Sequence, residues 1–456
     1  MIEGLKPYAE YKESGLPWLG KVPAHWVTKR GKSYMTAIDR RSQSGKEELL
    51  TVSSARGVIP RNTAKVTMFK AESYAGYKLC WPGDLVINSL WAWGGGLGVS
   101  QHHGIISTAY SVYRPRPSAR MNPRFLHELV RSSAFNWELH VRSKGIWISR
   151  LQLTDTSFLD APIPLPPPEE QAAIVRFLDH ANRKIDGFIR AKRKLIGLLN
   201  EQKQAIIHRA VTRGLHPDVP LKPSGIPWLG DIPQHWEVKK LRFLFRYSKG
   251  SRAAELTNEY IGHNAGAFPV FSGQTEHGGL MGRINWHEFD FAAPVVFVST
   301  VGARAMTTRI LTGKFSLSQN CALIIPRTKL ANPIYFENVF QRLFSFERYS
   351  ISQIMQPSLR FADLNRFYVP HPPIEEQIEI AASIELESEK LTTAIARTER
   401  EIALMQEYRT RLTADLVTGK LDVREAAAHL PAPPADPAAE EDLGEILEEP
   451  EGEKEE

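Results

Sequence analysis

Apolar residues recur at alternating steps of three and four along two long stretches of the chain, Glu169 to Val211 and Glu375 to Leu416. In the first stretch these residues are Ile174, Leu178, Ala181, Ile185, Phe188, Leu195, Leu199 and Ile206. In the second stretch they are Ile380, Ile384, Leu391, Ala394, Met405, Leu412 and Leu416. This spacing is typical of a helix that packs along another helix, so the sequence predicts two long α-helices with coiled-coil seams.

Short runs rich in β-branched residues precede each long stretch and predict strands. These runs are Leu49–Ser53, Asp84–Leu90, Ile105–Tyr113, Val295–Val301 and Cys321–Ile325. Glycine-rich segments separate them, which favours two compact α+β domains. Each domain also contains an amphipathic run, Phe125–Phe135 or Tyr335–Phe346, that follows an Asn-Pro pair. Asparagine is a good N-cap and proline fits the first helical turn, so both runs are expected to be helices.

The chain carries the same motifs twice. Ser14–Gly20, with the sequence SGLPWLG, is followed by Pro23, His25 and Trp26, and SGIPWLG at Ser224–Gly230 is followed by Pro233, His235 and Trp236. A second motif, PxPPxEEQ, opens both long stretches. Its members are Pro164, Pro166, Pro167, Glu169, Glu170 and Gln171, and then Pro370, Pro372, Pro373, Glu375, Glu376 and Gln377. The sequence therefore predicts a duplicated unit of domain plus helix.

Two such helices in one chain most simply pair antiparallel with each other. The predicted fold is then α+β, with two globular domains joined by two long antiparallel coiled-coil helices and internal pseudo-two-fold symmetry. The alternative is two tandem domains whose helices each meet another protein. Ile189, Ile196 and Ile207 lie off the predicted seam. We therefore expect them to leave apolar surface uncovered for a partner.

Charge and composition narrow the class of protein. The 456 residues are too many for one ordinary core. The net charge is +6, although the acids of segment 440–456 hide a more basic body, and a basic body indicates a polyanionic partner. Two cysteines, Cys80 and Cys321, cannot build a disulfide framework or a cysteine zinc site. No apolar stretch is long enough to cross a bilayer and no signal pattern opens the chain, so a cytoplasmic protein is expected.

The two duplicated motifs together resemble those of specificity subunits of type I restriction–modification enzymes, and the resemblance extends from about Tyr11 to Val423. It implies that each globular part is a target-recognition domain for half of a split double-stranded DNA sequence. It also implies that the helices are conserved spacers that dock two modification (methyltransferase) subunits. Those partners use S-adenosylmethionine to methylate adenine, and restriction subunits, if present, add translocation and cleavage driven by ATP with magnesium.

From the resemblance and the predicted elements we divide the chain into five parts. Residues 1–165 and 216–372 are the two target-recognition domains, and 166–215 and 373–424 are the spacer helices. The last part, 425–456, is rich in Pro, Ala and acids and is expected to be disordered. We interpret it as a solubilising tail; the alternative is a weak DNA mimic that shields a basic cleft.

No motif for catalysis is present. There is no GxxxxGK[ST] phosphate loop and no GxGxxG after a strand, and Gly94–Gly98 is expected to be a flexible loop. The segment Asn332–Tyr335 looks like the NPPY motif of amino-methyltransferases, but its duplicate at Asn122–Phe125 favours helix capping. The 14 histidines lack metal-ligand spacing. The chain is therefore expected to be non-catalytic, with no metal and no cofactor of its own.

Candidate DNA-binding residues are polar or aromatic side chains in loops that follow predicted strands, because base edges are read by such groups. In the first domain they are Ser53, Ser54, Arg56, Arg61, Asn88, Trp91, Trp93, Lys144, Trp147 and Arg150. In the second domain they are Ser272, Gln274, Arg304, Gln319, Asn320, Arg348, Gln353 and Gln356. The duplicated Trp18, Trp26, Trp228 and Trp236 are expected to be structural, since residues that read two different half-sites should differ.

Two other functions remain open at this point. One is a DNA-binding regulator made of tandem domains that acts without enzyme partners; the absence of a recognition-helix motif counts against it. The other is a coiled-coil adaptor that binds no DNA; the basic body and the polar loops count against it. Only the first interpretation, a specificity subunit, requires a stoichiometric methyltransferase partner.

Overall fold

The computed structural model describes residues 5–64, 73–145, 151–273, 276–302, 304–349 and 357–431. Internal contacts divide the chain into two compact units. Unit 1 comprises Met1–Lys192 and Arg400–Glu456, and unit 2 comprises Arg193–Glu399. Each unit thus combines one globular part with half of each long helix, and the five-part division made on the sequence stays a prediction.

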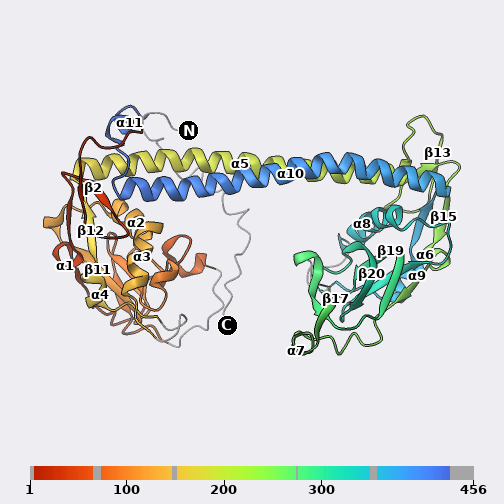
Figure 1. Ribbon diagram of the computed structural model, residues 1–456, viewed down its shortest axis with the longest axis horizontal. Coiled ribbons are helices and arrows are strands. Elements are labelled where there is room, and N and C mark those ends of the chain that lie inside the picture. The colour runs from red at the N-terminus through yellow and green to blue at the C-terminus, as the bar shows by residue number, and fades with distance from the viewer. Residues whose placement is uncertain are drawn as a thin grey trace. The chain divides into compact units, whose positions relative to one another are not determined.

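The two long helices are α5, Pro168–Arg213, and α10, Ile374–Val417. In unit 1, Asp186 of α5 forms an ion pair with Arg409, and Lys192 forms one with Glu401 at 2.6 Å. In this unit α10 therefore runs antiparallel to α5. In unit 2, Lys203 donates to the Thr392 hydroxyl at 3.0 Å. The predicted antiparallel helix pair is confirmed (Figure 1).

The buried stripe of α5 differs from the predicted seam. Ile189 and Ile207 are only 6% and 4% exposed, so the expectation that they leave apolar surface uncovered is wrong. Ile189 lies one helical turn after the buried Ile185 and continues its stripe, whereas Phe188 is half-buried. The apolar residues that do face outward on the two helices are Leu195, Leu198, Ile378, Leu386 and Leu404.

Unit 1 contains short strands and small sheets. Its central sheet has the order β4-β11-β8-β9, and the pairs β1–β2, β3–β12, β5–β6 and β7–β10 surround it. Its strands are β1 (Tyr11–Glu13), β2 (Lys21–Pro23), β3 (Val27–Arg30), β4 (Met35–Ala37), β5 (Leu50–Ser53), β6 (Gly57–Pro60), β7 (Lys78–Cys80), β8 (Leu85–Asn88), β9 (Leu97–Val99), β10 (Gly104–Ile106), β11 (Tyr110–Pro115) and β12 (Pro162–Leu165). Its helices besides α5 and α10 are α1 (Gly31–Tyr34), α2 (Pro123–Arg131), α3 (Ser133–Arg142), α4 (Asp155–Leu159) and α11 (Arg424–Ala428), with 3-10 turns η1 (Arg61–Thr63), η2 (Ala92–Gly94) and η3 (Pro117–Ala119).

Two predicted elements of unit 1 are each interrupted by a serine. The run Ile105–Tyr113 is split into β10 and β11, because the Ser107 hydroxyl accepts from the N–H of Ala109 and begins a turn. The run Phe125–Phe135 is split into α2 and α3, because Ser132 is the N-cap of α3 and accepts from the N–H of Phe135 at 3.2 Å.

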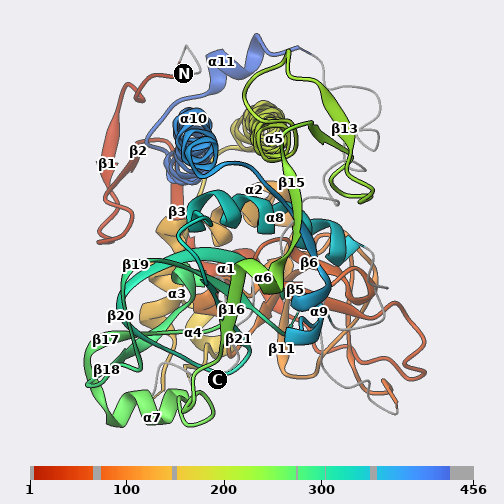
Figure 2. The same cartoon turned by 90° about the vertical axis from the view of Figure 1, so that its right-hand side faces the viewer.

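Unit 2 has a larger sheet of six strands, in the order β16-β21-β19-β20-β17-β18. Its strands are β13 (Leu221–Pro223), β14 (Asp231–Pro233), β15 (Glu237–Lys240), β16 (Phe245–Ser248), β17 (Ala265–Phe271), β18 (Leu280–Ile284), β19 (Phe289–Ser299), β20 (Thr308–Leu317), β21 (Cys321–Pro326) and β22 (Tyr368–His371). Its helices besides α5 and α10 are α6 (Leu241–Leu244), α7 (Asn258–His263), α8 (Pro333–Tyr349) and α9 (Phe361–Arg366), with η5 at Glu276–Gly279. Helix α8 lies between this sheet and the long helices in both views (Figures 1 and 2).

The capping predicted for the Asn-Pro pairs is confirmed in both units. Asn122 is the N-cap of α2, and its side chain accepts from the N–H groups of the next two non-proline residues. Asn332 precedes α8 and accepts in the same way from Ile334 and Tyr335. The backbone N–H of each asparagine donates to a glutamine of the other motif, Gln171 at 2.7 Å or Gln377 at 2.9 Å.

The duplicated motifs contact each other. The buried Glu170 accepts from Trp26 Nε1 at 2.8 Å and from the Tyr8 hydroxyl at 2.6 Å, and it pairs with His25 at 2.7 Å. In unit 2, Glu376 accepts from Trp236 Nε1 at 3.0 Å and pairs with His235 at 2.9 Å. Three of the duplicated tryptophans, Trp26, Trp228 and Trp236, are buried, and Trp18 is half-buried. The predicted structural role of these tryptophans is confirmed.

Candidate DNA interface

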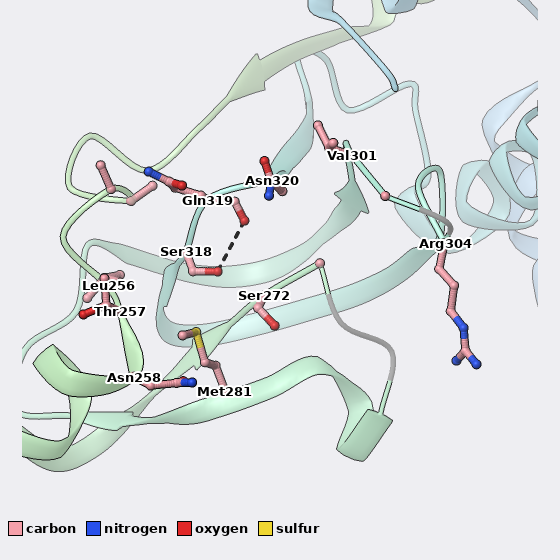
Figure 3. A pocket seen from close by; sticks show the side chains of 14 residues that line it. Leu256, Thr257, Asn258, Ser272, Met281, Val301, Arg304, Ser318, Gln319 and Asn320 are labelled. Atoms are coloured by element: carbon pink, nitrogen blue, oxygen red, sulfur yellow. Dashed lines mark hydrogen bonds between the residues drawn. The ribbon is translucent and has the colours of Figure 1, made fainter. Parts of the chain in front are cut away.

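A groove of about 770 Å³, lined by polar and apolar side chains, opens on unit 2 (Figure 3). Four of the residues predicted from the sequence line it, namely Ser272, Arg304, Gln319 and Asn320. They come from the ends of β17, β19 and β20. Thr257, Asn258, Met281, Val301 and Ser318 also line it. The groove therefore joins segments that are well separated in the sequence.

The backbone between β20 and β21 presents Gln319 and Asn320. Both side chains are exposed, and Asn320 has a left-handed conformation with φ of 64°. Asparagine tolerates this conformation better than most residues. The carbonyl of Asn320 accepts from the N–H of Thr300 at 2.7 Å, which ties the turn to the end of β19. The position of the two amide side chains is thus fixed by the sheet.

The opposite side of the groove is formed by the start of α7. Thr257 is the N-cap of this helix and accepts from the N–H of Tyr260 at 3.2 Å. Asn258 follows it as the first helical residue. This wall was missed from the sequence, because the segment before α7 matched neither a strand nor a long helix; the Thr-Asn-Glu capping pattern was the available signal.

Arg304 lies at one margin of the groove, is exposed, and extends away from the other labelled side chains (Figure 3). Its carbonyl accepts from the Ser299 hydroxyl at 2.8 Å, which fixes the loop after β19. Arg348 is half-buried at the end of α8 and is not among the residues that line the groove. Gln274, Gln353 and Gln356 lie outside the described residues.

Arg309 of β20 supports Ser272 and was not predicted from the sequence. Its guanidinium donates to the carbonyl of Ser272 at 3.2 Å and stacks on Phe297 at 4.1 Å and Phe271 at 5.1 Å. Burial lowers the pKa of this guanidinium. An arginine between two phenylalanines in a strand gives no sequence signal beyond β-patterning. Arg309 therefore acts on the groove by holding the loop after β17.

In unit 1 the turn between β5 and β6 carries Ser53, Ser54 and Arg56. The Ser53 hydroxyl accepts from the N–H of Arg56 at 3.3 Å and so shapes the turn. The Arg56 side chain donates to the carbonyl of Thr63 at 2.9 Å, and Arg61 begins η1 in the same region. Ser54 and Arg56 are exposed, whereas Ser53 and Arg61 are half-buried.

Asn88 is the last residue of β8, and Trp91 and Trp93 lie in the segment that follows it. The two indole rings lie 4.8 Å apart, and Trp91 is 48% exposed. The prediction of a flexible loop at Gly94–Gly98 is wrong: η2 ends at Gly94 and β9 begins at Leu97. A Cβ on Gly94 would lie 2.5 Å from Trp91 Nε1, so the glycines allow the indole to pack against the turn.

Arg131, at the end of α2, holds these two segments together. Its guanidinium donates to five carbonyls, those of Ser53, Ser54, Ala55, Gly95 and Leu97, at 2.5 to 3.5 Å. Burial lowers its pKa, although Glu128 opposes this. Such a fork on carbonyls is specific to arginine. The residue lies inside an amphipathic helix pattern and therefore gave no sequence signal.

A third predicted group also reaches this side of unit 1. Lys144 is exposed and pairs through its backbone with Gln152, and the N–H of Leu153 donates to the carbonyl of Ser89 at 2.9 Å. Lys144 therefore belongs to a segment joined to the end of β8. Trp147 and Arg150 lie outside the described residues.

The two surfaces offer binding chemistry. The groove of unit 2 presents hydroxyl and amide groups, and the joined turns of unit 1 present arginine, indole and hydroxyl groups. These are the groups that bond to base edges and phosphates. Within the described ranges, no set of three or more His, Cys, Asp or Glu side chains is placed to hold a metal ion, and no helix is long and apolar enough to span a membrane.

Comparison with known proteins identifies the family. Residues 233–401, which include the groove, match the family model described as Type I restriction modification DNA specificity domain. The chain carries a type I specificity domain. It is 33% identical over 131 residues to a protein described as a type I specificity subunit from Mycoplasma pneumoniae, covering 29% of this chain and 42% of that protein. It is 22% identical over 327 residues to the specificity subunit described for the MjaX type I restriction enzyme of Methanocaldococcus jannaschii, covering 67% and 69%.

The matches span less than half of the length of the two Mycoplasma pneumoniae specificity subunits, 42% and 43%. A chain in a solved structure described as a type I restriction–modification system resembles this chain over 87% of its residues and is itself covered over 98% of its length, with a TM-score of 0.63 and 17% identity. At that identity the likeness concerns the fold, two α+β parts with long helices. The type I specificity fold expected from the repeated motifs is confirmed.

Proposed function

We propose that this protein is the DNA-recognition subunit of a type I restriction–modification complex and that it reads a two-part target. Unit 2 would contact one half-site through the groove that Ser272, Gln319 and Asn320 line. Unit 1 would contact the other half-site through the turns that Arg131 joins. The match of residues 233–401 to the specificity-domain family supports the DNA-binding part of this proposal.

One observation carries the two-part reading: the framework is repeated and the candidate surfaces are not. Glu170 with Trp26 in unit 1 corresponds to Glu376 with Trp236 in unit 2. The candidate surfaces differ, with paired indoles and an arginine-held turn in unit 1 and an amide-rich groove in unit 2. A repeated framework that carries two different candidate surfaces favours the recognition of two different half-sites.

We further propose that the long helices dock two methyltransferase subunits. Leu198 of α5 and Leu386 and Leu404 of α10 are 52%, 60% and 58% exposed, and exposed leucines on a helix favour a protein partner. The partners would use S-adenosylmethionine to methylate adenine. Restriction subunits, if the host has them, would add ATP- and magnesium-dependent cleavage. In this arrangement the chain itself is non-catalytic, binds no cofactor, and works in the cytoplasm with the host DNA.

Methylation-sensitive sequencing of the host genome tests the proposal. We expect adenine methylation at a motif of two short specified sequences separated by unread bases. The motif should disappear when this gene is deleted and return when it is restored. A motif that survives the deletion, or a purified complex whose mass contains no methyltransferase, contradicts the proposal and favours a tandem-domain regulator.

A further inference from the structure

Unit 2 has a second cavity, of about 260 Å³, beside the repeated PWLG motif. Its walls come from the last turns of α5, from α8 and from the segment that leads into β14. The residues that line it are His208, Thr212, Arg213, Pro227, Trp228, Leu229, Gly230, Asp231, Arg342 and Phe346. None of the DNA-binding candidates is among them.

Basic side chains converge on this cavity. His208 and Arg213 of α5 face Arg342 of α8, and both arginines depress the pKa of His208, after burial as the larger cause. Within the part of the chain that the structure describes, neither arginine forms an ion pair. Arg342 Nε and His208 Nδ1 are buried and have no hydrogen-bond partner. Asp231 lies at the cavity but is exposed.

Unsatisfied donors of this kind destabilise a folded chain. The equivalent positions in unit 1 lack these basic side chains. By the alignment of Val211-Thr212 with Val417-Thr418, Ala414 and Gly419 replace His208 and Arg213. By the alignment of the two Asn-Pro pairs, Ser132 replaces Arg342. The repeated framework therefore does not require His208, Arg213 and Arg342, and the aligned positions of unit 1 carry no basic side chain.

We propose that this cavity is an anion site that receives a carboxylate side chain of a protein docked on the long helices. Arginine side chains bind carboxylates through paired, charge-assisted hydrogen bonds. The buried Trp228 and the exposed Phe346 give the cavity an aromatic wall, and arginine beside aromatic residues is typical of protein interfaces.

The position of the cavity favours a protein over DNA. Helix α8 lies between the sheet that carries the groove and the long helices in both views (Figures 1 and 2). The cavity lies where α8 meets the end of α5, because side chains of both helices line it. The occupant then comes from the methyltransferase, and this step rests on the proposed function. The two methyltransferase docking positions should then differ in affinity, because the aligned residues of unit 1 do not form this site.

The test measures the affinity of the full chain for its methyltransferase at several salt concentrations. Arg342→Gln and Arg213→Gln remove one cation each. Arg209→Gln is the matched control, because Arg209 lies on the same helix, is exposed, and does not line the cavity. We expect about tenfold weaker binding of one methyltransferase for Arg342→Gln, and a change within about twofold for the control. DNA binding by the free chain should stay unchanged.

Thermal unfolding of the free chain separates an anion site from a structural role. Removing the unpaired buried Nε should leave the melting temperature of Arg342→Gln unchanged or higher. A lower melting temperature with unaltered methyltransferase affinity overturns the proposal, and so does an equal loss of DNA affinity, which would indicate a phosphate site. A wild-type chain that binds no methyltransferase contradicts the proposed function itself, and with it the occupant named here.

Discussion

Trp26 donates its indole N–H to Glu170 at 2.8 Å, and this bond joins the two most conspicuous motifs of the sequence. The tryptophan lies directly before β3, and the glutamate lies in the first turn of α5. Glu170 is 3% exposed and also accepts from Tyr8. Its negative charge is therefore balanced by donors and by the positive end of the helix.

Glu170→Gln should destabilise unit 1 more than Glu376→Gln destabilises unit 2. An amide offers one acceptor and turns its NH2 group toward donors that the carboxylate satisfied. We expect a loss of about 2–4 kcal/mol in the free energy of unfolding for Glu170→Gln. Among the described residues, Glu376 accepts from Trp236 and His235, and its side chain is 18% exposed, so about half of that loss is expected.

Denaturant unfolding of the full chain measures both effects. Glu169→Gln is the control, because Glu169 is the exposed neighbour in the same motif. If Glu169→Gln and Glu170→Gln destabilise equally, the glutamates act only through the helix dipole and the indole bond is unimportant.

The sequence was informative where it repeats. Residues such as Trp236 and Glu376 recur at fixed spacing because one packing solution is used twice, and this repetition predicted the framework, the long helices and the capped starts of α2 and α8. The seam was placed less accurately. Leucine and isoleucine alternate on several faces of α5, and only the contacts with α10 and the globular parts decide that Ile189 is buried.

The candidate site was predictable in part. Ser272, Gln319 and Asn320 were found because they follow strongly patterned strands, and the sheet order then brings them to one groove. Arg131 and Arg309 were missed for a physical reason. Each supports a loop through backbone carbonyls, and carbonyls are present at every residue, so no residue type marks the contact partner.

Unit 1 should lose stability as the pH falls from about 6.5 to about 4 because of His127. Burial, and then Arg131 and Arg124, lower the pKa of His127 from 6.5 to about 4. The folded state keeps this ring neutral while the unfolded state binds a proton, so stability rises with pH within this window. Between the two ends of this pH range, the free energy of unfolding changes by about 3 kcal/mol because of His127. Below about pH 4 both states bind the proton, and this contribution changes no further.

The measurement compares unfolding of the wild type and His127→Gln at several pH values, because Glu128 acts in the opposite direction in both proteins: burial raises its pKa. The difference between the two proteins should shrink by about 3 kcal/mol between pH 7 and pH 4. His140→Gln, an exposed change in α3, is the control. Parallel pH profiles for the wild type and His127→Gln would contradict this assignment.

Arg131→Lys should loosen the turns of unit 1 and weaken binding to one half-site. An ammonium group has three donors and lacks the planar fork, so it cannot bond to all five carbonyls. We expect a loss of about 2 kcal/mol in stability and a lower affinity for DNA that carries the half-site of unit 1. Arg116→Lys, at an exposed position, should change neither quantity. Equal loss at both half-sites would show that Arg131 stabilises the whole chain.

Gln319→Ala and Arg304→Ala should affect only the half-site of unit 2. Each removes a side chain that lines the groove and carries no core packing, and a base-edge contact contributes about 1–3 kcal/mol. Gln319 lines the groove beside Asn320, so its loss should relax base preference. Arg304 extends away from them, so its loss should weaken binding with a smaller salt dependence (Figure 3). Selection on randomised DNA checks both variants, and equal changes at the two half-sites would refute a division of labour.

The helices should set the number of unread bases between the half-sites, and lengthening both of them should change it. Because α5 pairs with α10, the added residues must enter both helices, for example after Gly197 and after Ala396. A Cβ placed on Gly197 would meet no atom within 4 Å, so a side chain is tolerated at this point of α5. Four added residues extend each helix by about 6 Å and turn it by about 40°.

The added length is close to the rise of two base pairs, and the added turn is close to the twist of one. Two base pairs advance the duplex by about 7 Å and turn it by about 70°, so the preferred gap should grow by one or two base pairs while the bases read at each end stay the same. A seven-residue insertion in both helices is the control for phase. It adds about 10 Å but turns the helix by only about 20°, whereas three base pairs turn DNA by about 100°. This variant should therefore methylate poorly at every gap. A methylation map decides between the outcomes: an unchanged gap with full activity in the four-residue variant would exclude the helices as a ruler, and altered half-sites would refute modular recognition.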